Sequence, residues 1–102
     1  ISEADAYLAQ PGVAYDSANW KELIGTQKWI ALYNRGFEGW TEYRRLDEPD
    51  FLVNSALTDL PVPTRVFYPV DEVALNRANY DAAVQNIGGS DDLYTKIFWD
   101  VN

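Results

Sequence analysis

Hydrophobic residues recur with a helical period over much of the first third of the chain. The stretch Ser2–Gln10 predicts a short helix, because Ser2 can cap an acidic first turn and Pro11-Gly12 then breaks the pattern. A second helix is expected to begin near Ala18. This helix is amphipathic in its first turns. One of its sides carries Trp20, Leu23, Ile24 and Gln27.

Further along the same helix, the stretch Trp29–Tyr33 is apolar on every side. A helix that is hydrophobic all round is buried, so this stretch is expected to form a buried spine that joins the segment to helices outside it. Gly36 and Gly39 bracket its end, and Trp40–Leu46 is predicted to continue as a second helical stretch.

The periodic pattern disappears between Asp47 and Thr64, where proline, asparagine, serine and aspartate residues predict a long connection. A structureless loop of this length is uncommon inside a compact domain. We therefore expect it to lie over other structure.

The last third of the chain predicts a short extended run at Arg65–Tyr68, a helical turn capped by Asp71, and a longer helix capped by Asn76. The pair Gly88-Gly89 ends this helix. The aromatic tail Thr95–Trp99 suits an edge strand or a docked end.

Composition narrows the fold and the classes of function. The expected fold class is mainly α, an irregular helical segment with long loops and little or no β, forming one incomplete domain over residues 1–102. The net charge of −8 argues against nucleic acid as a partner, because it repels phosphate backbones. The chain has no cysteine and no histidine, which removes thiolate nucleophiles, zinc sites of Cys and His, and the commonest general base. We expect no enzyme activity, no cofactor and no metal.

Two pairs of carboxylates are the remaining candidates for chemistry. Glu38 and Glu42 would share one face of a continuous helix, and glycosidases use two carboxyl groups. The arginines that follow favour salt bridges instead. Asp91 and Asp92 follow Gly-Gly-Ser and could offer oxygen ligands to calcium, but their spacing does not fit an EF-hand loop. Capping and turn formation explain this second pair better.

Trp40, Tyr43 and the pair Arg44-Arg45 allow two interpretations. Flat aromatic rings stack on the apolar faces of sugars, and arginine donates paired hydrogen bonds. The same residues also form a packing stripe, because Trp40 and Tyr43 lie three apart on a helix. Packing is the favoured interpretation, and Trp40 and Tyr43 stay as the candidates for glycan binding.

An ordered series of residues carries a resemblance to a known family. The series runs through nearly the whole chain: Leu23-x-x-x-Gln27-Lys28-Trp29-x-Ala31-Leu32, then Gly36-x-x-x-Trp40-x-x-x-Arg44-Arg45, then Pro63-x-Arg65-x-x-Tyr68-Pro69-x-x-Glu72-x-x-x-Asn76-x-x-Asn79-Tyr80, then Gly88-Gly89-Ser90-Asp91-Asp92, Thr95-Lys96 and Trp99-Asp100. It resembles the C-terminal region of the SusD/RagB family of nutrient-binding outer-membrane lipoproteins.

The resemblance implies a helical, non-catalytic protein on the outer face of the outer membrane, anchored by a lipid on an N-terminal cysteine. Such proteins capture glycans, or in some members peptides, and cap a SusC-like TonB-dependent transporter. The chain begins with Ile and lacks the cysteine, so it is expected to be a C-terminal segment that packs against an N-terminal remainder.

Five residues match signature positions of the family and are interpreted as framework. They are Gln27, Lys28, Trp29, Arg65 and Asn76. A buried Arg or Asn among them is expected to bond carbonyls of the connection Asp47–Thr64 and hold it in place.

Two other classes of protein stay open at this point. The chain could be a free-standing helical module whose exposed aromatic residues bind a partner protein. A glycoside hydrolase fragment that uses Glu38 and Glu42 is the second alternative.

Overall fold

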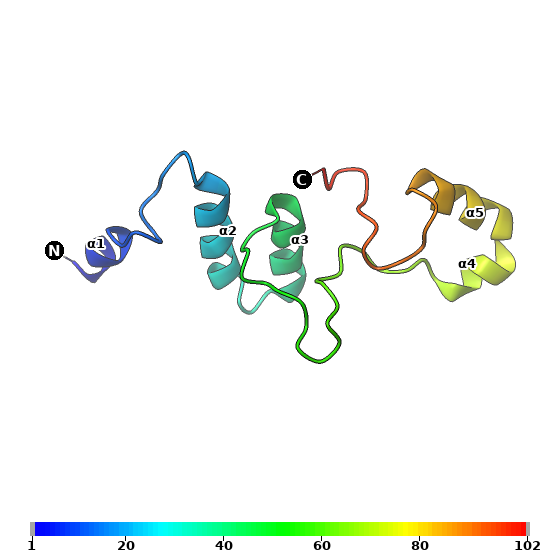
Figure 1. Ribbon diagram of the computed structural model, residues 1–102, viewed down its shortest axis with the longest axis horizontal. Coiled ribbons are helices and arrows are strands. Elements are labelled where there is room, and N and C mark those ends of the chain that lie inside the picture. Colours follow the sequence, from blue (N-terminus) through cyan, green and yellow to red (C-terminus); the bar gives the residue numbers. More distant parts are fainter. Residues whose placement is uncertain (1, 102) are drawn as a thin grey trace. The chain divides into compact units, whose positions relative to one another are not determined.

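The computed structural model describes residues 2–101 and holds five helices in that range, with no strand (Figure 1). The helices are α1 (Glu3–Leu8), α2 (Trp20–Ala31), α3 (Gly36–Leu46), α4 (Val70–Leu75) and α5 (Arg77–Asn86). The prediction of a mainly α fold with long loops is confirmed. The described chain divides into two compact units, residues 2–52 and residues 53–101.

The first helix begins as its sequence predicts. The Oγ of Ser2 accepts a hydrogen bond from the backbone N of Asp5 (3.2 Å), and the Asp5 carboxylate accepts one from the backbone N of Ser2 (3.1 Å). This reciprocal capping box satisfies two backbone N–H groups that the helix start would leave unpaired.

The core of the first unit lies where α2 and α3 pack against each other. Gly39 of α3 is buried, and a Cβ built on it would lie 3.6 Å from the ring of Trp29 and 3.8 Å from Leu32 of α2. Leu46 at the end of α3 is 2 % exposed, and Pro49 just beyond it is fully buried. These contacts form a small apolar centre.

Within the described residues the stretch Trp29–Tyr33 is only partly covered, and its burial against further helices of the protein stays a prediction. Ile30 is 56 % exposed and Tyr33 is 88 % exposed, whereas Trp29 and Leu32 are half-buried. The physical reason is that α3 is the helix that packs against α2, so only the side of α2 that faces α3 is covered.

The connection between α3 and α4 contains no helix or strand, as predicted. Part of it closes on itself: the backbone N of Ser55 donates to the carbonyl of Leu60 (2.9 Å), and the amide of Asn54 donates to the carbonyl of Asp59 (3.2 Å). Asp59 adopts a left-handed backbone conformation with φ of 52°, which aspartate tolerates better than most residues.

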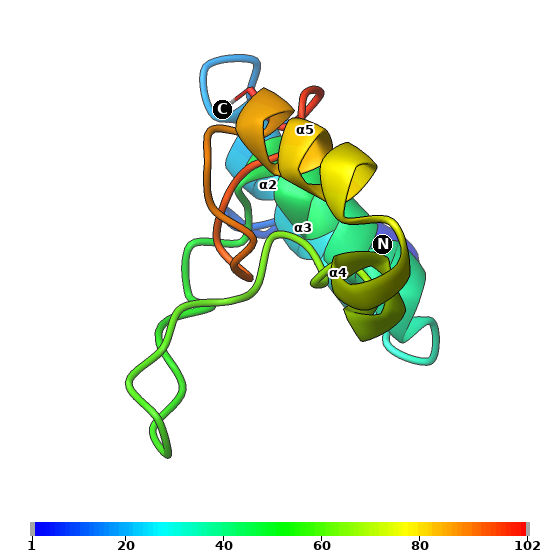
Figure 2. The same ribbon diagram turned by 90° about the vertical axis from the view of Figure 1, so that its right-hand side faces the viewer.

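In the second unit, α4 and α5 follow each other closely and pack together (Figure 2). Pro69 occupies the N-cap position of α4, so the prediction that Asp71 caps this helix is wrong, and Asp71 lies in its first turn. Asn76 does precede α5, and Gly88 and Gly89 follow its end with φ of 107° and 91°. Glycine adopts these angles at low cost, so the predicted end of the helix is confirmed.

Within residues 2–101 the tail forms no edge strand, and its first residue, Thr95, is joined to the segment before α4. The backbone N of Thr64 donates to the carbonyl of Leu93 (2.8 Å), and the Thr64 hydroxyl donates to the carbonyls of Leu93 and Thr95 (3.2 and 3.3 Å). These few bonds join one segment before α4 to one segment after α5, and no ladder forms. The residues between them bring several polar side chains together.

Candidate functional site

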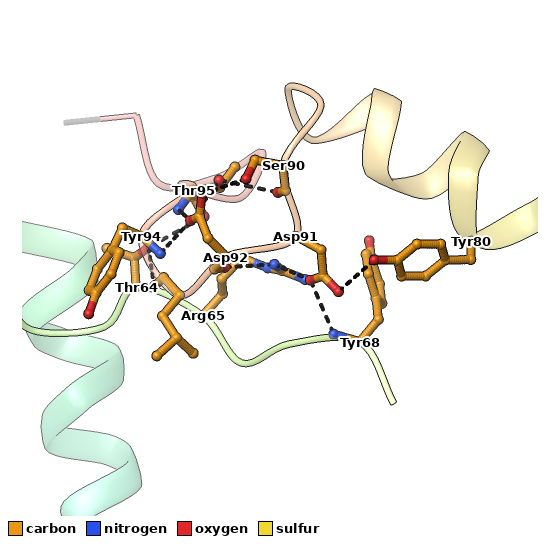
Figure 3. Close-up of polar contacts among 10 residues, drawn as sticks. Thr64, Arg65, Tyr68, Tyr80, Ser90, Asp91, Asp92, Tyr94 and Thr95 are labelled. Atoms are coloured by element: carbon orange, nitrogen blue, oxygen red, sulfur yellow. Dashed lines mark hydrogen bonds and ion pairs between the residues drawn. The ribbon is translucent and has the colours of Figure 1, made fainter. Parts of the chain in front are cut away.

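A polar cluster in the second unit joins the segment before α4 to the loop after α5 (Figure 3). We call it the Arg65 cluster: Arg65, Tyr68, Tyr80, Asp91 and Asp92. Arg65 is 6 % exposed, and its Nη1 donates to Asp91 Oδ1 (2.6 Å) and to the carbonyl of Asp92 (2.8 Å). Its guanidinium also lies 4.8 Å from the ring centroid of Tyr68. The arginine charge is therefore paired and stacked.

The carboxylate of Asp91 lies at the centre of the cluster. Besides Arg65, it accepts bonds from the backbone N of Tyr68 (3.3 Å) and the hydroxyl of Tyr80 (3.2 Å). Partial burial opposes the charge, but the hydrogen bonds from Arg65, Tyr68 and Tyr80 outweigh it and lower the pKa of Asp91. Burial, together with the bond to Asp91, raises the pKa of Tyr80.

Asp92 organises the loop that follows. Its carboxylate accepts bonds from the Ser90 hydroxyl (2.7 Å), the backbone N of Tyr94 (2.7 Å), and both the backbone N and the hydroxyl of Thr95 (2.7 and 2.9 Å). These bonds, that from Ser90 first, lower the pKa of Asp92 to about 2. The turn interpretation of Asp91 and Asp92 is confirmed. Within residues 2–101, no group of three or more His, Cys, Asp or Glu side chains could hold a metal ion.

Glu38 and Glu42 each bond basic side chains. Glu38 accepts from Arg35, and Glu42 lies 2.6 Å from Arg45 and 2.8 Å from Lys28. The hydrogen bond from Arg35 lowers the pKa of Glu38, and those from Arg45 and then Lys28 lower the pKa of Glu42. A catalytic general acid needs a raised pKa, so the geometry favours the salt-bridge interpretation.

Three of the expected framework residues occupy consecutive positions on α2 and contact different parts of the first unit. Gln27 accepts a bond from the hydroxyl of Tyr7 (2.7 Å), and Lys28 reaches Glu42. The ring of Trp29 lies against Gly39. Consecutive residues on a helix point about 100° apart, which explains their three directions.

The other two framework residues do not hold the connection Asp47–Thr64, so this prediction is wrong. Arg65 bonds the carbonyl of Asp92, because the segment before α4 runs beside the loop after α5. Asn76 donates to Glu72 Oε2 (2.8 Å) and accepts from the amide of Asn79 (2.6 Å), so it joins α4 to α5.

The glycan candidates of the first unit lie on α3. Trp40 is half-buried, and the guanidinium of Arg44 lies 3.8 Å from its ring centroid. Trp40 also lines an open, almost wholly apolar hollow of about 510 Å³ with Gly36 and Phe37. Tyr43 is half-buried and is not among the residues that line this hollow. Of the two glycan candidates, only Trp40 therefore lines this hollow.

A hollow of about 300 Å³ in the second unit was not predicted from the sequence. Its lining combines two aromatic rings with polar groups from both helices: Tyr68, Pro69, Glu72, Asn79, Tyr80 and Ala83. The spacing Glu72-x-x-x-Asn76-x-x-Asn79-Tyr80 contained the signal, but it could be interpreted only once the junction between α4 and α5 was known.

Comparison with known proteins places the chain in a family. Residues 1–69 match the model of the SusD-like family described as starch-binding and associating with the outer membrane. The match covers more than half of the chain, so the chain belongs to this family, and the resemblance seen in the sequence is confirmed.

Solved structures agree over the whole chain. A chitin-binding protein is 42 % identical with a TM-score of 0.78, and a SusD-like protein of Bacteroidetes is 28 % identical with a TM-score of 0.82. Both alignments cover 100 % of this chain but only 23 % and 21 % of the relatives. No curated protein matches the chain. None of the helices within residues 2–101 is long and apolar enough to cross a membrane.

Proposed function

We propose that this chain is the C-terminal part of a surface glycan-binding lipoprotein that captures oligosaccharides or polysaccharides for a SusC-like TonB-dependent transporter. The observation that carries the proposal is the match over the full chain to a chitin-binding protein at 42 % identity, together with the family's description as starch-binding. In this proposal the protein lies at the outer membrane, is exposed at the cell surface and is anchored through a lipidated N-terminal cysteine. Its role is binding without turnover.

The exposed apolar side chains of the first unit support packing against an N-terminal remainder of the same protein. Among the described residues, Leu46 and Pro49 are the only apolar side chains that are buried, whereas Ile30, Tyr33 and Phe37 are 56 %, 88 % and 81 % exposed. Exposed apolar surface of this extent marks an interaction site. The main contribution of the chain is therefore support for the rest of the protein.

Trp40 is the better of the two glycan candidates. Arg44 stacks on its ring, and the ring lines an open hollow beside Phe37. A rigid aromatic face beside an apolar hollow suits the C–H face of a sugar. Tyr43 lies about one turn further along α3 and is the second candidate for contact with the glycan.

Calorimetry of the full-length protein against starch and chitin oligosaccharides and against peptides tests the proposal. We expect binding to at least one glycan and little affinity in residues 1–102 alone. Micromolar glycan binding by these residues alone would contradict the supporting role. Purification of the full-length protein together with a TonB-dependent transporter would support the partnership, and tight binding to peptides only would contradict glycan capture.

A free-standing module that binds a partner protein is the alternative. The exposure of Tyr33 and Phe37 favours it, because such residues anchor protein interfaces. The length of the open reading frame separates the two proposals. A frame several hundred residues longer, with a lipobox cysteine, supports the lipoprotein, and a frame of about this length supports the module.

A further inference from the structure

We propose that the hollow between α4 and α5 is a subsite for one neutral sugar ring of the captured glycan. We call it the Glu72 hollow, and its lining residues are Tyr68, Pro69, Glu72, Asn79, Tyr80 and Ala83. The inference rests on the proposed function and adds a place on this chain where the glycan is contacted.

The polar groups of the Glu72 hollow have unused hydrogen-bonding capacity. The side-chain amide N of Asn76 donates a hydrogen bond to Glu72 Oε2 (2.8 Å). The side-chain oxygen of Asn76 accepts one from the amide N of Asn79 (2.6 Å). Within the described part of the chain, the second carboxylate oxygen of Glu72 and the amide oxygen of Asn79 accept no hydrogen bond. Asn76 thus holds two acceptors in place beside one hollow, which suits a ligand that presents several O–H donors.

The aromatic walls of the Glu72 hollow are fixed before a ligand arrives. The rings of Tyr68 and Tyr80 lie edge to face, with centroids 5.9 Å apart and planes at 78°. Arg65 stacks over Tyr68, and the hydroxyl of Tyr80 is bonded to Asp91. Because the Arg65 cluster holds both rings, little side-chain ordering remains for ligand binding, and this preorganisation favours affinity.

Size and charge limit the ligand. A volume of about 300 Å³ is at the lower end of the range for small-molecule sites, so it suits a single ring of a longer chain. A carboxylate in the lining and the net charge of −8 repel uronic acids and phosphorylated sugars. Apolar walls with a few fixed acceptors match a neutral pyranose, which has one C–H face and an edge of hydroxyl groups.

NMR of the full-length protein, labelled with ¹³C at its alanine methyl groups, locates binding directly. Ala83 lines the Glu72 hollow, whereas its neighbour Ala82 is exposed and does not. Titration with maltotriose and with chitotriose should shift the Ala83 methyl signal and leave that of Ala82 unchanged. The unbound spectrum also shows whether each variant is folded.

A matched pair of substitutions measures the contribution of the carboxylate. Glu72→Ala should weaken binding of the effective trisaccharide about tenfold, because a hydrogen bond to a charged acceptor is lost. Asp71→Ala removes the same charge from the adjacent, exposed position of α4 and should leave the affinity unchanged. A trisaccharide that ends in a uronic acid should bind more weakly than its neutral counterpart.

The outcomes separate the two proposals. If a glycan binds while Ala83 stays unshifted and both variants bind equally, the subsite is wrong and the proposed function stands. If neither trisaccharide nor starch and chitin polymers bind to the full-length protein, both are overturned. Equal loss of affinity in Glu72→Ala and Asp71→Ala would also reject a specific role for Glu72.

Discussion

Gly25→Ala provides a sharp test of the packing in the first unit. Gly25 is buried in α2, and a Cβ at this position would clash with the Cβ of Glu48 and lie 3.3 Å from its carbonyl carbon and oxygen. Glu48 precedes Pro49, which is fully buried, so its backbone has little room to retreat. Overpacking costs about 1–3 kcal/mol, and the upper part of this range, about 2–3 kcal/mol, is expected here because the atoms that the new Cβ meets are a Cβ and a backbone carbonyl, which cannot rotate away.

The alanine also stabilises the helix, and this gain must be subtracted from the cost of overpacking. Alanine is favoured over glycine inside a helix by about 1 kcal/mol. The net result expected for Gly25→Ala is therefore a loss of stability of about 1–2 kcal/mol. Gly39→Ala is the matched control on α3, since its Cβ would meet Trp29 and Leu32 at ordinary contact distances of 3.6 to 3.8 Å. It should gain about 0.5–1 kcal/mol.

Hydrogen–deuterium exchange of the full-length protein, read on peptides that cover α2 and α3, measures both changes. A loss of 1–2 kcal/mol corresponds to local opening about 5 to 30 times more frequent. Gly25→Ala should therefore exchange faster than the wild type, and Gly39→Ala should exchange more slowly. Equal or slower exchange in Gly25→Ala would show that the contact between α2 and Glu48 is not close-packed, and the reasoning would fail.

Three further predictions concern the charged groups. Arg65→Ala removes both Nη1 bonds to the loop after α5, so hydrogen exchange in that loop should accelerate about tenfold. Unchanged exchange would show that the Arg65 cluster does not hold this loop. Asp92 has a folded pKa of about 2, below its usual 3.8. The stability that Asp92 contributes is therefore complete above about pH 5 and is lost as the pH falls toward 2. Protection of the Thr95 amide from hydrogen exchange, measured by NMR, should decrease over the same pH range. Glu42→Gln breaks two exposed salt bridges and should change the free energy of unfolding, measured by urea denaturation, by less than about 1 kcal/mol. Release of reducing ends that depends on Glu42 would instead revive the glycosidase hypothesis.

Local signals in the sequence predicted the helices well. The capping box at Ser2, the glycine pair after α5 and the proline-rich connection each act within a few residues, so the chain itself carries the information. The main error at this level was the cap of α4. Pro69 fits the N-cap position because proline needs no N–H there, and Asp71 offered a competing but misplaced signal.

Signals that depend on neighbouring segments were harder to interpret. The apolar stretch Trp29–Tyr33 predicted burial, but burial is decided by what packs around α2, and α3 covers one side of it. Arg65 was correctly recognised as framework, yet its partners in the loop after α5 lie 26 and 27 residues away in the sequence. The Glu72 hollow was missed for the same reason, since it exists only where α4 meets α5.

The three directions taken by Gln27, Lys28 and Trp29 have a consequence for how this family can change during evolution. A single residue inserted earlier in α2 would turn all three side chains by about 100° and remove their contacts with Tyr7, Glu42 and Gly39 in one step. Insertions and deletions are therefore expected to be rare within α2. The turn at Asn54–Leu60 closes on its own backbone, so changes in length are expected to accumulate there.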